Sequence, residues 1–214
     1  MIKFEFEEKE YEFPEGYQEM TLQHFINLNK VQWKNSVLPV MEEFLTIQIL
    51  EAVTLQPSGT FDDITMGELY DLTTYLNKLL QEVDEFSKKD FKIGSNCIEF
   101  EGKLWGYYED PNDYKTAEVA DINTLMLDKK AEYEYIRDIA AIIIRPMEWK
   151  ETKQGTKILK SVKQTKEDWE ANKPIIAKMD LEFVTRGVNF FLSGLNQSNK
   201  ITKSYLKIKK DPIQ

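Results

Sequence analysis

His24 and Cys97 are the only histidine and the only cysteine in this 214-residue chain, so they limit its acid–base and metal chemistry. A catalytic histidine needs an orienting carboxylate and a nucleophile or a substrate proton within reach. His24 stands in a stretch with helical spacing, and we interpret it as a surface or partly packed side chain. Cys97 falls in an expected strand, and we interpret it as a buried, inert thiol. A single cysteine excludes a disulfide within the chain and a cysteine-based zinc site.

Acidic residues occur in clusters, and carboxylates alone can bind a metal ion or hydrolyse a substrate. The run from Asp110 to Asp113 comes nearest to a calcium loop, but it lacks the central glycine, and we interpret it as a turn. Neither a P-loop nor a glycine-rich dinucleotide motif is present. We therefore expect no catalytic residue, no metal ion, no cofactor and no enzymatic activity. The alternative is an unrecognised carboxylate-based hydrolase, in which acids would converge in a cleft.

Charge is distributed unevenly along the chain. Residues 1–149 carry 14 Lys and Arg against 30 Asp and Glu, whereas residues 150–214 carry 14 against 7. Such asymmetry is typical of a binding tail or of head-to-tail contacts, although each half can also be a plain solvated surface. We expect partner binding through two sets of residues: Lys200, Lys203, Lys207, Lys209 and Lys210 on one side, and Glu7, Glu8, Glu10 and Glu12 on the other.

The basic C-terminal stretch also raises the question of nucleic-acid binding, because lysine beside Tyr205 can combine phosphate contact with base stacking. The stretch contains no arginine and a single aromatic residue, and the rest of the chain is acidic. Nucleic acid is therefore an unlikely partner, and a packaged cargo protein associated with a genome is the alternative. We expect no membrane and no small-molecule substrate among the partners.

The hydrophobic pattern predicts an α+β fold, mostly helical, with two β-hairpins at about 2–13 and 91–108 packed on a helical core. Alternating apolar residues indicate the first hairpin. Thr65 and Glu68 have the spacing of a capping box. Three of the predicted helices begin near Thr21, at Pro39 and at Ile64 or Thr65. Two more span about 118–144 and 166–195. The last of these has a possible break near Pro174 and a stop at Gly194 and Asn196.

We divide the chain into an acidic hairpin-plus-helix domain over 1–149 and a basic part over 150–214. The basic part is expected to comprise a surface linker or loop at 150–165, the C-terminal helix and a lysine-rich tail, packed on the first part as one unit. No apolar run reaches the roughly 18 residues of a membrane span, and the N-terminus does not resemble a signal peptide. A cytosolic location is therefore expected.

Several segments carry a resemblance to a known group of proteins. They are the hairpin ending at Phe13 and Pro14, residues 20–28, 45–55 and 64–72, the run from Ile139 to Pro146, and residues 190–192. In their order they resemble small virion and tail-assembly proteins of tailed bacteriophages, including crAss-like and related gut phages. The likeness covers about residues 2–195.

The resemblance implies a non-catalytic structural or assembly protein that acts through protein–protein contacts. It would be a minor component of the virion, neck or tail, or a tail-assembly chaperone. Its partners would be other phage structural proteins, copies of itself, or both. Its location would be the virion, or the host cytoplasm during phage assembly.

Overall fold

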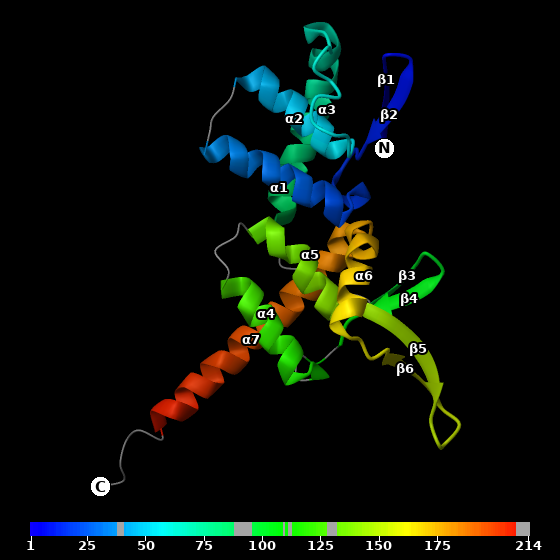
Figure 1. The fold of residues 1–214 in the computed structure, drawn as a ribbon, viewed down its shortest axis with the longest axis vertical. Coiled ribbons are helices and arrows are strands. Elements are labelled where there is room, and N and C mark those ends of the chain that lie inside the picture. Colours follow the sequence, from blue (N-terminus) through cyan, green and yellow to red (C-terminus); the bar gives the residue numbers. More distant parts are fainter. Residues whose placement is uncertain (38–40, 88–95, 109, 111–112, 128–131, 209–214) are drawn as a thin grey trace.

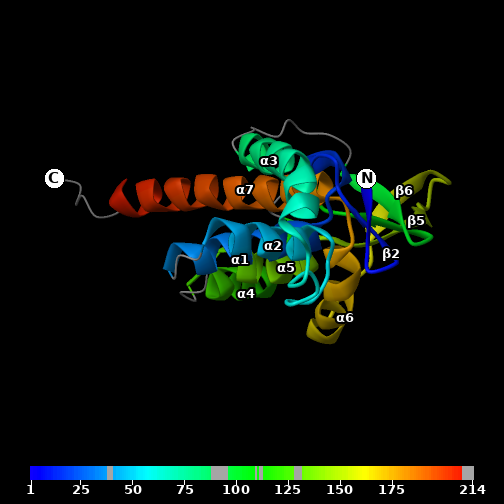
Figure 2. The same ribbon diagram turned by 90° about the horizontal axis from the view of Figure 1, so that it is seen from above.

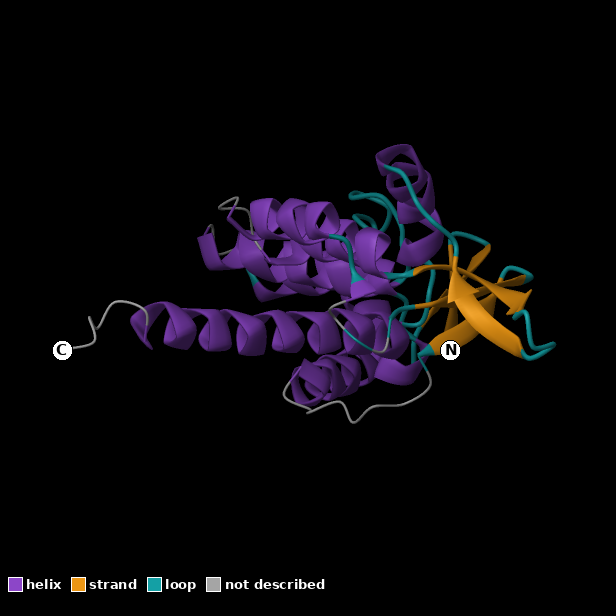
Figure 3. Cartoon of the chain, turned by 90° about the horizontal axis from the view of Figure 1, so that it is seen from below, coloured by secondary structure: helices purple, strands orange, loops and turns teal. Residues whose placement is uncertain are grey.

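The computed structural model describes residues 1–37, 41–87, 96–108, 110, 113–127 and 132–208. For residues 33, 36–37, 87, 132–134 and 195–208 it describes the backbone alone. The fold is α+β, as predicted, and mostly helical, with a two-stranded and a four-stranded antiparallel sheet. Both sheets lie to one side of the helical part (Figure 2 and Figure 3). No helix within the described ranges is long and apolar enough to cross a membrane.

The N-terminal hairpin is confirmed as strands β1 (Ile2–Phe6) and β2 (Lys9–Phe13). Its apolar face packs on Phe61, whose ring centroid lies 5.7 Å from that of Phe4 and 5.0 Å from that of Tyr11. The two turn residues, Glu7 and Glu8, have φ angles of 49° and 61°. This left-handed backbone matches the twist of the two strands but is unusual outside glycine, asparagine and aspartate.

Four helical elements follow the hairpin: η1 (Tyr17–Glu19), α1 (Leu22–Val37), α2 (Glu42–Val53) and α3 (Met66–Ser87). The helix expected to begin at Pro39 begins at Glu42 in the structure, and residues 38–40 lie outside the described ranges. The capping box of α3 is confirmed, because the Thr65 backbone N–H donates to Glu68 Oε2 at 2.9 Å. In return, Glu68 N–H donates to Thr65 Oγ1 at 3.4 Å.

The second set of helices differs from the prediction in three places. Instead of one helix over 118–144 there are α4 (Thr116–Leu127) and α5 (Glu132–Ile143), and residues 128–131 lie outside the described ranges. The C-terminal helix is divided into α6 (Lys166–Ala177), which contains Pro174, and α7 (Leu181–Ile208). The predicted stop at Gly194 and Asn196 is wrong, because the helical backbone of α7 continues through both residues.

The four-stranded sheet has the order β3 (Cys97–Phe100), β4 (Lys103–Gly106), β5 (Arg145–Glu151), β6 (Lys157–Ser161). Its first two strands confirm the predicted second hairpin, although residues 91–95 lie outside the described ranges. The linker expected at 150–165 is wrong, because β5 and β6 form a further hairpin there, in addition to β1–β2 and β3–β4. Its stability comes from pairing with β4 and from a turn at Gly155, whose φ is 78°.

The hydrophobic core extends from the N-terminal hairpin to α7, and a large part of it lies at the end of α5 and the start of α7. Residues Ile139 to Ile144 are all buried, as are Val184 and Phe191 of α7. Gly187 allows α7 to approach Tyr107, the residue after β4, because a Cβ atom at this position would lie 2.9 Å from its ring. Pro146 ends the helical path, since the residue before a proline is restricted to extended geometry.

The start of α7 is bonded to the start of α1. Leu22 N–H donates to the Met179 carbonyl at 3.1 Å, and Leu181 N–H donates to the Met20 carbonyl at 3.0 Å. Segments that are about 160 residues apart in the sequence are thus held side by side. Beyond this junction α7 extends past the ends of the other helices (Figure 2).

Candidate functional site

His24 is buried, which corrects its interpretation as a surface or partly packed side chain. It lies in the first turn of α1, where its Nδ1 accepts a hydrogen bond from the Thr21 backbone N–H at 3.0 Å. A backbone N–H can only donate, so Nδ1 carries no proton and the neutral ring is protonated at Nε2. His24 thus takes the place that a glutamate takes in a capping box.

This hydrogen bond has a consequence for the protonation of His24. Burial lowers the pKa of His24 from 6.5 to about 4, because a charged imidazole loses hydration in the interior. A proton on Nδ1 would also place a second hydrogen-bond donor against the Thr21 N–H, and the hydrogen bond between them would be lost. The imidazole is therefore neutral at pH 7 and supports the helix start.

Glu118 and Arg145 form a buried ion pair that was not predicted from the sequence. The side chains are 3 % and 1 % exposed, and Arg145 Nη1 lies 3.4 Å from Glu118 Oε1. Glu118 belongs to the first turn of α4, where its Oε2 accepts the Lys115 backbone N–H at 2.9 Å. Arg145 is the first residue of β5, and its Nη2 donates to the Ile142 carbonyl at 2.7 Å.

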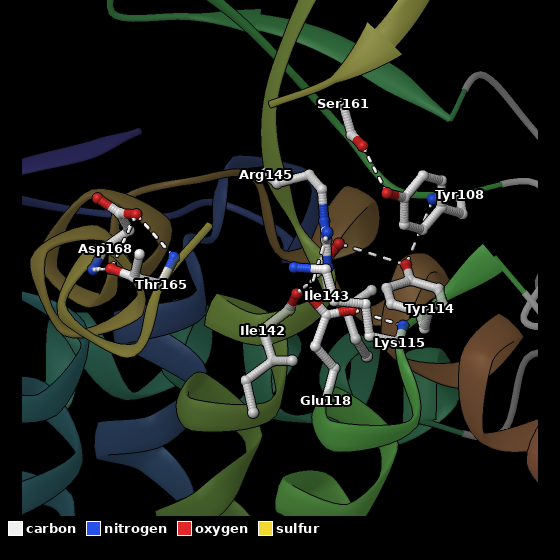
Figure 4. Close-up of polar contacts among 10 residues, drawn as sticks. All are labelled: Tyr108, Tyr114, Lys115, Glu118, Ile142, Ile143, Arg145, Ser161, Thr165 and Asp168. Carbon is white, nitrogen blue, oxygen red and sulfur yellow. Dashed lines mark hydrogen bonds and ion pairs between the residues drawn. The ribbon is translucent and has the colours of Figure 1, made fainter. Parts of the chain in front are cut away.

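Two tyrosines complete the surroundings of the guanidinium group, as Figure 4 shows. Its central carbon lies 4.8 Å from the ring centroid of Tyr108 and 5.1 Å from that of Tyr114. The hydroxyl of Tyr114 donates to the Ile143 carbonyl at 3.3 Å, and Ser161 Oγ donates to the hydroxyl of Tyr108 at 2.6 Å. Burial raises the pKa of Tyr114, so its phenol stays protonated at neutral pH.

The other buried acid, Glu51 in α2, stabilises a loop. Its Oε1 accepts the backbone N–H groups of Gly59 at 2.6 Å and Thr60 at 3.0 Å. Among the described residues the buried acids are thus Glu51 and Glu118, on different helices, and both accept backbone N–H groups. The same part of the chain contains no group of three or more His, Cys, Asp or Glu placed to hold a metal ion. Cys97 lies in β3 as expected, but its side chain is only partly buried.

The predicted acidic set lies together on the N-terminal hairpin. Glu10 and Glu12 project from the face opposite Phe61, and Glu7 and Glu8 form the turn, so all four are exposed. Lys3 Nζ lies 2.7 Å from Glu10 Oε1, which offsets part of this charge. The hairpin therefore has an apolar face that attaches it to the body and an acidic face in solvent.

The predicted basic set is only partly within the described residues. Lys200, Lys203 and Lys207 lie in the last turns of α7, while Lys209 and Lys210 lie outside the described ranges. The acidic hairpin and the end of α7 lie at opposite ends of the long axis (Figure 1). Within one copy of the chain the backbone at Lys200, Lys203 and Lys207 thus lies far from the acidic set that the sequence predicts the lysines to meet.

Comparison with models of protein families, with curated protein sequences and with solved structures found no significant match.

We expect the Glu118–Arg145 pair to be essential for stability. Glu118→Ala should lower the free energy of unfolding by about 3–5 kcal/mol, because it leaves a buried, uncompensated cation. The double variant Glu118→Leu/Arg145→Met should lose less, since it removes both charges. Urea denaturation followed by circular dichroism measures both values.

Asp121→Ala is the matched control for this experiment. Asp121 lies one turn further along α4 and pairs with the exposed Lys166 at 3.0 Å. Its loss should change the free energy of unfolding by about 1 kcal/mol or less. The stabilising role of the Glu118–Arg145 pair would be contradicted if Asp121→Ala and Glu118→Ala changed the free energy of unfolding equally. It would also be contradicted if the changes in unfolding free energy were simply additive in the double variant.

His24 should make stability depend on pH. Because its pKa is lower in the folded than in the unfolded chain, its contribution is complete above about pH 6.5 and is lost as the pH falls towards about 4. The full loss amounts to about 3 kcal/mol. His24→Gln removes this titration, so the difference in unfolding free energy between wild type and variant should shrink over that window. Parallel pH profiles, measured by urea denaturation, would show that the ring is not buried in its neutral form.

Proposed function

We propose that this chain is a non-catalytic structural or assembly protein of a tailed bacteriophage, acting through protein–protein contacts. In this proposal it is a minor virion, neck or tail component, or a tail-assembly chaperone. It works in the virion or in the host cytoplasm during assembly. Its partners are other phage structural proteins, copies of itself, or both. The phage setting is supported by the resemblance of residues 2–195 alone, and the mode of action by the distribution of charge.

The separation of charge along the molecule is the observation that carries this proposal. The four glutamates of hairpin β1–β2 are exposed at one end, and the last turns of α7 bring three lysines to the other. The helical backbone of α7 runs from the body towards the end of the molecule opposite the acidic hairpin (Figure 1). Opposite charges at opposite ends favour contact between different molecules, arranged head to tail.

The junction between α1 and α7 supports a defined contact geometry. Thr21 and Asp180 form a β-bridge, and the two backbone hydrogen bonds around it hold the start of α7 against the start of α1. The acidic hairpin precedes α1 closely in the chain. The direction of α7 is thereby set relative to the acidic end, which suits a protein that binds neighbours in a fixed orientation.

The use of the buried polar side chains supports binding rather than catalysis. His24 and Glu118 accept N–H groups at the starts of α1 and α4, and Glu51 accepts N–H groups of a loop. Each of these three groups has a role in holding the backbone. In the proposed function they build the scaffold, and the exposed charges make the contacts.

Association should depend on the lysines at the end of α7. In about 50 mM salt, sedimentation should show wild-type self-association that weakens as salt is raised towards about 1 M, because screening shortens to about 3 Å. Replacing the five lysines by glutamine, or ending the chain after Asn196, should abolish it. The replaced residues are Lys200, Lys203, Lys207, Lys209 and Lys210.

A control variant with the same net charge separates a specific contact from a general charge effect. It carries five glutamines in place of exposed lysines elsewhere and should associate like wild type. The residues are Lys30, Lys34, Lys103, Lys115 and Lys178. If wild type is a monomer at every salt concentration and the α7 variant is identical to it, self-association through these ends is refuted.

A further inference from the structure

The hairpin β5–β6 has an aromatic residue that the body leaves uncovered. Along β5, Arg145, Met147 and Trp149 point to the same face, since alternate residues of a strand share a face. Burial decreases along this row, from the enclosed Arg145 to the half-buried Met147 and then to Trp149, which is 65 % exposed. The core-facing side of the hairpin thus continues beyond the helices. Trp149 is paired in register with Leu159 of β6, which adds a second apolar side chain to this surface.

Lysines lie on this hairpin, with Lys157 on the face of Trp149, Lys153 in the turn, and Lys150 and Lys160 on the opposite face. Residues 148–163 carry five lysines and two glutamates, an excess of three positive charges in a chain whose net charge is −9. All five lysines are exposed, and Lys150 has a long ion pair of 3.8 Å with Glu148. An aromatic centre with a charged rim is the usual arrangement of a binding hot spot. The lysines are Lys150, Lys153, Lys157, Lys160 and Lys163.

The first half of α3 has the complementary properties. Met66 and Tyr70 are one helical turn apart on the outer side of the helix and are 62 % and 77 % exposed. Leu69, Leu72 and Leu76 face the core instead. Residues 61–77 contain four acidic residues and neither Lys nor Arg. These acids are Asp62, Asp63, Glu68 and Asp71, and all four are exposed.

We propose that the β5–β6 hairpin of one copy docks on the first half of α3 of a second copy. Trp149 would pack against Met66 and Tyr70, and Lys157 and Lys153 of the hairpin would face the acids around them. This inference rests on the proposed function, because it specifies one contact through which copies associate. The two surfaces match in charge and in apolar content, and each contains large side chains that the rest of the chain leaves exposed.

The position of the two surfaces agrees with head-to-tail association. In Figure 1, α3 lies towards the same end of the long axis as the acidic hairpin, and β5–β6 lies towards the end that α7 approaches. A contact between β5–β6 and α3 therefore joins the basic end of one copy to the acidic end of the next. This is a heterologous contact, in which each copy uses a different surface on either side.

A charge exchange tests the contact. The hairpin variant is Lys153→Glu/Lys157→Glu, and the α3 variant is Asp62→Lys/Asp63→Lys/Asp71→Lys. Each variant alone faces like charges across the contact, so each should associate at least roughly tenfold more weakly than wild type in sedimentation at low salt. An equimolar mixture restores opposite charges at both possible contacts and should regain association. Both variants keep the lysines of α7 and the glutamates of β1–β2.

Trp149→Ala provides a second test that leaves the charge unchanged. It should weaken association roughly tenfold or more, because an aromatic anchor at the centre of an interface contributes most of its binding energy. Tyr75→Ala is the matched control, since Tyr75 is also exposed but projects from another side of α3. Circular dichroism and the urea midpoint verify that each variant is folded.

The possible results separate the two proposals. One contrary result is that wild type associates while the mixed charge variants do not regain association; another is that wild type associates while Trp149→Ala has no effect. In either case the hairpin does not dock on α3, but the proposed self-association is not refuted. If wild type is monomeric at low salt, this contact and self-association through the ends of the molecule are both refuted, and only binding to other proteins is left of the proposed function. If monomeric protein binds a single-stranded oligothymidylate and Trp149→Ala abolishes this binding, the surface recognises nucleic acid and the inference is overturned.

Discussion

The burial of Arg145 is the constraint on which the arrangement of helices and strands depends. Removing a guanidinium group from water is costly, and its partners must offset that cost together. They are the carboxylate of Glu118 at 3.4 Å, the Ile142 carbonyl at 2.7 Å and the rings of Tyr108 and Tyr114. These groups come from the start of α4, the end of α5 and the segment after β4. All of these elements must be in place before the cation is satisfied, so the pair selects one packing of the chain.

Two surfaces take their direction from this cluster. Arg145 begins β5, so the position of its side chain orients the strand that carries Trp149 out of the body. Tyr114 also contacts α7, where its ring centroid lies 4.8 Å from that of Phe191. The course of α7 and that of the β5–β6 hairpin are therefore linked through one buried group. This explains how a polar cluster without access to solvent can determine which residues lie exposed on the surface.

Sequence patterns predicted the features that depend on neighbouring residues. The alternation in 2–13, the spacing of Thr65 and Glu68, and the effect of Pro146 are local, and the structure confirms all three. The β5–β6 hairpin was not predicted, because the apolar residues Ile158, Leu159 and Val162 are few and stand among many lysines. Its pairing with β4 is a long-range contact, which a local pattern does not indicate. A turn around Gly155 between two alternating segments was a signal for it. Nothing local indicated the Glu118–Arg145 pair, whose members are 27 residues apart, or the burial of His24, which depends on the start of α7.

The place of β6 at the outer side of its sheet has a consequence for the behaviour of the protein at high concentration. An outer strand presents a row of backbone N–H and C=O groups that can pair with strands of other molecules and start uncontrolled aggregation. β6 carries Lys157 and Lys160, both exposed, within five residues. Two such strands brought edge to edge would place these cations close together, and their repulsion opposes the pairing. The lysines therefore help to keep the chain from forming extended β-structure.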